Sequence, residues 1–114
     1  MPLADLTLTE LRDALRRGET TSVAATQAML NRIVAHDNTL QSYLGVTDKM
    51  ALERAAAADP RRAAGDDSPL LGVPLAVKDI LCLAGAPTTA GSKILEGFIP
   101  PYNAYAVDRL LAAG

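Results

Sequence analysis

The spacing of apolar residues in the first third of the chain predicts two helices joined by a short turn. Thr7 and Glu10 have the spacing of a capping box, in which each side chain accepts a hydrogen bond from the other's backbone N–H at a helix start. Leu11 and Leu15 then recur four residues apart, which places both on one helix face. Gly18 marks the end of this first helix, because glycine readily adopts the left-handed conformation that follows a last turn.

The second and third helices are predicted from caps and composition. Thr21 or Ser22 caps the second helix, because hydroxyl side chains satisfy the free N–H groups of a first turn. Its apolar stripe consists of Val23, Met29, Leu30, Ile33 and Val34. Asp48 is predicted to cap an alanine-rich third helix over Lys49–Ala58. That helix should end at Asp59–Pro60, because the residue before a proline is pushed out of helical geometry.

Two short strands and a last helix are expected in the rest of the chain. Tyr43–Thr47 and Gly72–Val77 are rich in residues that favour strands, and the second segment is apolar on both faces. Pro74 must then lie at the start of its strand or on an unpaired side. Asn103 is predicted to cap a final helix that stops at Gly114.

This order of elements predicts an α/β fold in which helices pack on a mixed sheet. We expect one domain segment over residues 1–114, helical over 1–65 and carrying a strand and a candidate lysine over 70–114. Two strands are too few to cover a segment that is apolar on both faces. The sequence therefore predicts the N-terminal part of a larger fold, incomplete in this chain.

Composition excludes several functional classes. Apolar residues make up 49% and charged residues 21% of the chain, as in globular proteins, and the net charge is −2. No basic stripe is present, so direct binding to nucleic acid is not expected. No apolar run approaches the roughly 20 residues of a membrane span, and the acidic N-terminus does not resemble a signal peptide. The single cysteine is typical of a reducing cytoplasm.

Lys78 is the leading candidate for chemistry. It follows directly on the apolar segment Gly72–Val77 and precedes Asp79. In a strand it would share a face with Pro74 and Ala76, which leave room beside its stem. A lysine at this place can be an ordinary solvated strand end, which is the more common case. It can also be a base, if apolar burial destabilises its ammonium form.

A resemblance to a known family favours the second interpretation. The stretch GVPLAVKD, followed by TTAGSKILEGFIPPYNAYAVDRLLAAG, resembles the amidase signature family. Within that family, the opening LTLTELRDALRRGETTSVAATQAMLNRI is most similar to the A subunits of glutamyl-tRNA(Gln)/aspartyl-tRNA(Asn) amidotransferases. The most specific part is Thr88–Lys93 with the following Pro100–Tyr102. The resemblance spans nearly the whole chain.

The resemblance implies a Ser–cis-Ser–Lys triad in which Lys78 is the base. In such a triad a bridging serine relays the proton and a second serine attacks the amide carbonyl. Both serines and the oxyanion-hole backbone belong to a later Gly/Ser-rich segment, which the sequence up to Gly114 does not contain. Ile80 and Asn103 depart from the residues usual at their positions. We expect the 114-residue chain to be inactive alone.

The function implied by the resemblance is hydrolysis of glutamine to supply ammonia. The ammonia would amidate Glu-tRNA(Gln) or Asp-tRNA(Asn) with partner B and C subunits, so that tRNA is contacted only indirectly. No cofactor is expected on this chain, and ATP and magnesium belong to the partner. The alternatives are an amidase of the same family that acts on another amide, and a non-catalytic structural or interaction module.

Other reactive residues are weaker candidates. Cys82 and His36 are far apart in sequence and are interpreted as a small, partly buried thiol and a solvent-facing histidine near a helix end. Ser92 is interpreted as a loop or helix-cap serine, and Thr88 and Thr89 as support for the backbone near the site. One histidine and one cysteine give no metal-ligand spacing, and no phosphate-binding glycine pattern occurs.

Overall fold

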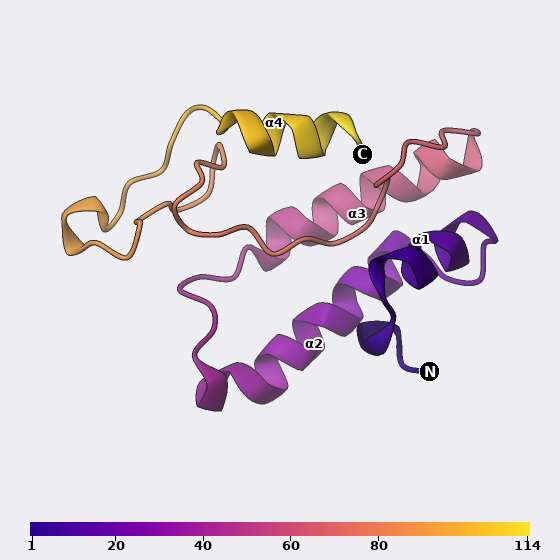
Figure 1. Ribbon diagram of the computed structural model, residues 1–114, viewed down its shortest axis with the longest axis horizontal. Coiled ribbons are helices and arrows are strands. Elements are labelled where there is room, and N and C mark those ends of the chain that lie inside the picture. The colour runs from indigo at the N-terminus through magenta and orange to yellow at the C-terminus, as the bar shows by residue number, and fades with distance from the viewer.

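The computed structural model describes residues 1–114 as a set of helices followed by a long coil and a last helix (Figure 1). No strand is present. The elements, in chain order, are the 3-10 turn η1 (Leu3–Asp5), α1 (Leu8–Arg16), α2 (Ser22–Leu40), α3 (Asp48–Ala63), the 3-10 turn η2 (Lys93–Leu95) and α4 (Tyr105–Ala112). In Figure 1, α1 crosses the N-terminal end of α2, and the coil after α3 returns alongside that helix.

The start of α1 confirms the capping box. The Glu10 backbone N–H donates to Thr7 Oγ1 at 3.3 Å, and the Thr7 N–H donates to Glu10 Oε2 at 2.8 Å. Leu11 and Leu15 are buried against Ala25 of α2, with Leu6 and Val73 packed at the edge. The predicted apolar face of α1 is therefore the contact that joins it to α2.

The N-terminal end of α2 is bound by residues from two other parts of the chain. Thr21 is its cap, and its side chain accepts a hydrogen bond from the Ala24 N–H at 3.1 Å. Asp59 of α3 accepts from the Ser22 N–H at 2.7 Å. The Ser22 hydroxyl donates to the Gly72 carbonyl at 2.6 Å, so the helix start is held by α3 and by the coil together.

The predicted end of α3 at Ala58 is wrong, because the helix continues through Pro60 to Ala63. Proline removes one helical hydrogen bond. Burial of Ala55 and Ala58, with the bonds that Asp59 accepts from α2, favours the helical path over a break. The other end also differs slightly, since Asp48 is the first helical residue rather than the cap.

Neither predicted strand forms. Tyr43–Thr47 is an exposed connection, and residues 74–77 make no backbone hydrogen bond within the chain. A strand is stable only when a neighbour pairs with its backbone, and no segment pairs with these residues here. Leu75 and Val77 stay 48% and 38% exposed. The mixed sheet is therefore not formed by these residues.

The last helix begins one residue later than expected and uses Asn103 differently. Ala104 is the N-cap of α4. Asn103 instead accepts from the Ala84 N–H at 2.7 Å through its side-chain oxygen, and its side-chain NH₂ donates to Asp108 at 2.9 Å. After α4 the chain returns to the coil, where the Gly72 N–H donates to the Gly114 carbonyl at 3.3 Å.

Apolar side chains outnumber the buried positions available to them. Only 13 of the 114 residues are buried, and the large apolar residues left exposed lie mainly on three stretches. These are the end of α2 with the following loop, the coil around Lys78, and the turn at η2. The exposed residues of the last two stretches are Leu75, Val77, Ile80, Ile94, Leu95, Phe98 and Ile99.

We expect the substitution Gly72→Ala to lower the free energy of unfolding by about 3 kcal/mol, from left-handed strain and overpacking together. Gly72 has a φ of +74°, and an added Cβ would lie 2.8 Å from the Ser22 Cβ and Oγ. Gly18→Ala is the matched control, because Gly18 has a φ of +69° and no atom within 4 Å of the added Cβ. Denaturant unfolding measures both, and equal losses would contradict the close approach to Ser22.

We expect the isolated chain to self-associate through its exposed apolar stretches, because contiguous apolar surface of this kind drives association. Light scattering coupled to size-exclusion chromatography, over a range of concentrations, measures the mass. Replacing Ile80 and Ile94 by serine should shift the mass toward the monomer, since their side chains are 62% and 93% exposed. A monomeric chain with one sharp, reversible unfolding transition would contradict the expectation.

Candidate functional site

Lys78 lies exposed at the end of the unpaired segment 74–77. Its carbonyl accepts a hydrogen bond from the Leu81 N–H at 2.9 Å, which closes a turn directly after it. Its amine is in no ion pair or hydrogen bond with the rest of the chain. The 114 residues thus hold the backbone of Lys78 on one side and leave its amine free, without the apolar burial expected of a base.

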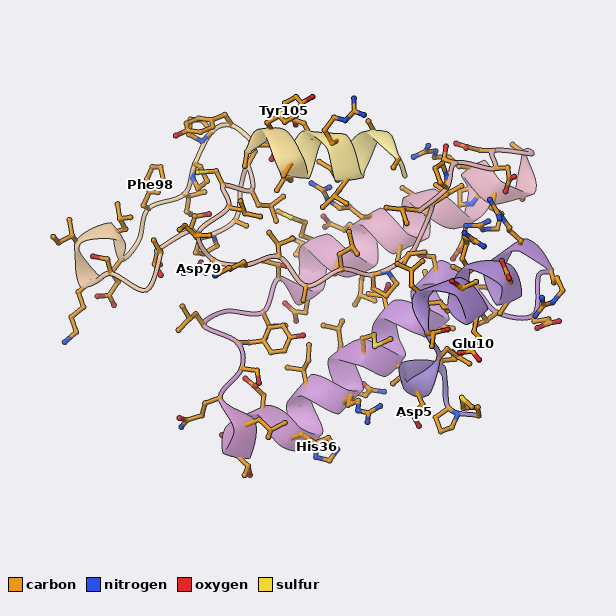
Figure 2. All side chains as sticks on the ribbon, viewed as in Figure 1. Asp5, Glu10, His36, Asp79, Phe98 and Tyr105 are labelled. Carbon is orange, nitrogen blue, oxygen red and sulfur yellow. The ribbon has the colours of Figure 1, made fainter.

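Asp79 joins the lysine segment to the threonine motif that follows. Its Oδ2 accepts hydrogen bonds from both the N–H of Thr89, at 3.2 Å, and the Thr89 hydroxyl. Its own carbonyl accepts from the Ala90 N–H at 3.0 Å. Figure 2 shows Asp79 on the long coil between α3 and α4. Three hydrogen bonds therefore link one residue to a segment ten positions later.

The threonine motif forms a compact turn around these bonds. The Thr89 hydroxyl oxygen accepts from the Gly91 N–H at 3.2 Å, and the Thr89 carbonyl accepts from the Ser92 N–H at 2.8 Å. Ala90 has a φ of +49°, which is uncommon for a residue with a Cβ. Ser92 then caps η2 by accepting from the Ile94 N–H, as expected for a cap serine.

Thr88 anchors the other side of the turn. It is only 4% exposed, its N–H donates to the Phe98 carbonyl at 3.1 Å, and its hydroxyl lies 3.5 Å from the Ala86 carbonyl. Both Thr88 and Thr89 therefore hold the local backbone through hydrogen bonds, and their role near a catalytic site stays a prediction. Asp79 was not singled out from the sequence. The available signal was a carboxylate next to Lys78 with hydroxyl residues ten positions on.

The Thr89 hydroxyl lowers the pKa of Asp79 below its ordinary value, because the bond favours the ionised carboxylate. Partial burial acts in the opposite direction, and the Thr89 and Gly91 N–H groups add to the lowering. Asp79 therefore carries a negative charge at neutral pH. That charge strengthens the two bonds that it accepts from Thr89.

The remaining candidates stay apart from this turn. His36 is exposed on α2, well away from Asp79 in Figure 2, and Cys82 is half-buried on the coil. No cluster of three metal-ligating side chains occurs in the chain. Two surface hollows border the C-terminal half of α2 and the loop after it, and Lys78 lines neither. None of the helices combines the length and the apolar character that a bilayer span requires.

Comparison with known proteins assigns the family. The family model described as Amidase matches residues 24–114, which include the Lys78 segment and the threonine turn. The chain belongs to the amidase family. The motif resemblance noted in the sequence is thereby confirmed over most of the chain.

Curated relatives agree on a narrower name. The chain is 53% identical over 114 residues to the A subunit of glutamyl-tRNA(Gln) amidotransferase from Geobacter metallireducens, covering 100% of this chain and 24% of the relative. It is 51% identical to the protein of the same name from a Roseiflexus species, covering 98% of this chain and 23% of the relative. The chain thus spans about a quarter of the length of these relatives.

Solved structures share the arrangement of the elements. Two match with TM-scores of 0.88 and 0.90 at 33% identity, covering 96% of this chain and 24% of theirs. They are described as a vestigial protein complex that reveals the evolutionary origins of an s-triazine catabolic enzyme. The arrangement of helices and coil in this chain is therefore shared with the matched quarter of those two structures.

We expect Thr89→Val to raise the pKa of Asp79 toward its ordinary value of about 3.9. The substitution keeps the shape of the side chain and removes the hydroxyl that donates to the carboxylate. Because folding lowers this pKa, the stabilisation is present above about pH 3.9 and is lost as the pH falls through the folded value. Carboxyl-carbon NMR titration measures the shift.

Asp66 is the internal control in the original protein and in the Thr89→Val protein. Ser68 holds the pKa of Asp66 at about 2, and neither residue contacts Thr89. Its titration should not change in the Thr89→Val protein. An Asp79 titration that is identical in the two proteins would show that the hydroxyl is not the cause of the lowered pKa.

Proposed function

We propose that this chain supplies the base of a Ser–cis-Ser–Lys amidohydrolase, with Lys78 in that role. The observation that carries the proposal is the free amine of Lys78 beside a fixed backbone turn, within the stretch that matches the amidase family. In this reaction Lys78 accepts a proton from the bridging serine, which in turn activates the attacking serine. The two serines are groups outside the 114 residues.

The proposed substrate is glutamine, and the proposed product is ammonia for a tRNA-dependent amidotransferase. Eight relatives at 48–53% identity are named as the A subunit of glutamyl-tRNA(Gln) amidotransferase, which supports this choice. The ammonia would be used on Glu-tRNA(Gln) or Asp-tRNA(Asn) in a complex with B and C subunits. The partner would hold ATP and magnesium, and the complex would act in the cytoplasm.

A second enzymatic candidate is an amidase of the same family that acts on another amide. The match to structures associated with an s-triazine catabolic enzyme favours keeping it, since the same fold there is linked to different chemistry. Its 33% identity is well below the 53% of the Geobacter metallireducens relative, so glutamine is the better choice. A non-catalytic module is the remaining alternative, and it fits the behaviour expected of the chain alone.

We expect no glutaminase activity from the 114-residue chain alone. Activity should appear when it is co-expressed with the part of the Geobacter metallireducens relative that it does not cover. In that complex, Lys78→Ala should lower kcat by about 10²–10⁴-fold, the usual contribution of a positioned base. Ammonia release from glutamine measures turnover, and co-purification confirms that the two pieces associate.

Lys49→Ala is the matched control. Lys49 is an exposed lysine on α3 that approaches only Glu53, at 4.0 Å, so its loss should leave turnover unchanged. Turnover by the chain alone that Lys78→Ala abolishes would overturn the expectation of inactivity. A complex that co-purifies and whose turnover survives Lys78→Ala would overturn the role of Lys78.

A further inference from the structure

We propose that Asp79 is a positioning residue for Lys78, acting through its hydrogen bonds to Thr89 and Ala90. The inference rests on the proposed role of Lys78 as a base and adds the means by which that base is placed. Asp79 itself touches neither substrate nor reacting atoms. Its function is to fix the backbone from which the lysine side chain extends.

The backbone directly before Lys78 has no hydrogen bonds of its own. Residues 74–77 form no backbone hydrogen bond in this chain, so no main-chain bond fixes the path directly before Lys78. After Lys78, the bonds of Asp79 to Thr89 and Ala90 are the first links to another segment. The placement of the Lys78 Cα therefore depends on the residue that directly follows it.

The segment to which Asp79 is bound is held by contacts of its own. Thr88 is buried and tied to Phe98, and Thr89 is tied to Gly91 and Ser92. That turn is fixed by several bonds that do not involve Lys78. A segment without backbone bonds of its own that is bonded to such a turn is positioned by the turn. The hydrogen bonds of one Asp79 carboxylate oxygen and of the Asp79 carbonyl link Lys78 to this turn.

Asp79 does not pair with the amine of Lys78 in this structure. No ion pair forms between Lys78 and Asp79, although they are neighbours in sequence. The Asp79 Oδ2 is already taken by the two donors of Thr89. The carboxylate therefore points toward the turn while the amine remains free for another group. The geometry is that of an anchor for the backbone.

Misplacement of a catalytic group by about 1 Å can cost on the order of 100-fold in rate. In the reconstituted complex, Asp79→Ala and Thr89→Val should each lower kcat by about 10–100-fold on this basis. The KM for glutamine should stay within about two-fold, because an anchor of the base contributes to chemistry rather than to substrate binding. Thr89→Ser keeps the hydroxyl and should restore kcat to within about three-fold of the original.

Asp66→Ala is the matched control for loss of an acid that organises a turn. One Asp66 oxygen accepts from both the N–H and the hydroxyl of Ser68, at 2.9 and 2.5 Å, as Asp79 does from Thr89. Its loss should leave kcat unchanged. Amide hydrogen exchange on the 114-residue chain supplies a second readout. Asp79→Ala should speed exchange at Thr89 and Ala90, and Asp66→Ala should not.

The outcomes separate this inference from the proposed function. Faster exchange at Thr89 and Ala90 with a lower kcat and an unchanged KM supports the positioning role. Unchanged exchange, unchanged kcat, or no rescue by Thr89→Ser overturns it, even when Lys78→Ala remains inactive. A complex in which Lys78→Ala retains full turnover overturns the proposed function, and with it the catalytic meaning of the Asp79 bonds.

Discussion

The hydrogen bond from the buried Ser22 hydroxyl to the Gly72 carbonyl is the contact on which the arrangement of this chain depends. It forms only because Gly72 has no Cβ and adopts a positive φ, which lets the coil approach the start of α2. Asp59 binds the same helix start from α3, and Gly114 bonds Gly72 from the C-terminal end. One small junction thus joins three helices and the coil.

The coil has backbone hydrogen bonds near that junction, none over a short stretch after it, and several again on the way to the threonine turn. The backbone is bonded at Gly72 and Val73, open over residues 74–77, and bonded again from Lys78 onward. Lys78 lies where the open stretch meets the ordered one. The Asp79–Thr89 bonds therefore define its position on one side, while the unbonded stretch separates it from the helix junction on the other.

The sequence predicted features whose cause is local. The capping box at Thr7, the cap at Thr21 and the stop at Gly18 each depend on residues within one turn, and all three are confirmed. The predictions of two strands were wrong, because a strand depends on a partner strand that can lie anywhere in a protein. The predictions for Asn103 and Pro60 were wrong for a related reason. Contacts with distant residues outweighed the local preference of asparagine for a helix cap and of proline for a helix end.

The candidate site likewise contains one residue that local sequence predicts and one that depends on distant contacts. Lys78 stood out because a charge at the end of an apolar run is visible in one segment. The importance of Asp79 could not be read from the sequence alone, because its partners lie ten residues away across an irregular turn with no periodic pattern. Hydroxyl residues in such a turn have many acceptors nearby. Only the folded backbone selects Asp79 among them.

Because Lys78 is exposed, its proposed role as a base requires that something else cover it. An ammonium group gives up its proton near neutral pH only when its surroundings disfavour the charge. The residues that flank it, Leu75, Val77 and Ile80, are exposed and apolar, and the backbone beside them is open to pairing. A surface that pairs with this backbone and covers these side chains would remove water from Lys78 as well. Under the proposed function, a covering surface of this kind would give Lys78 the apolar surroundings that a lysine base requires.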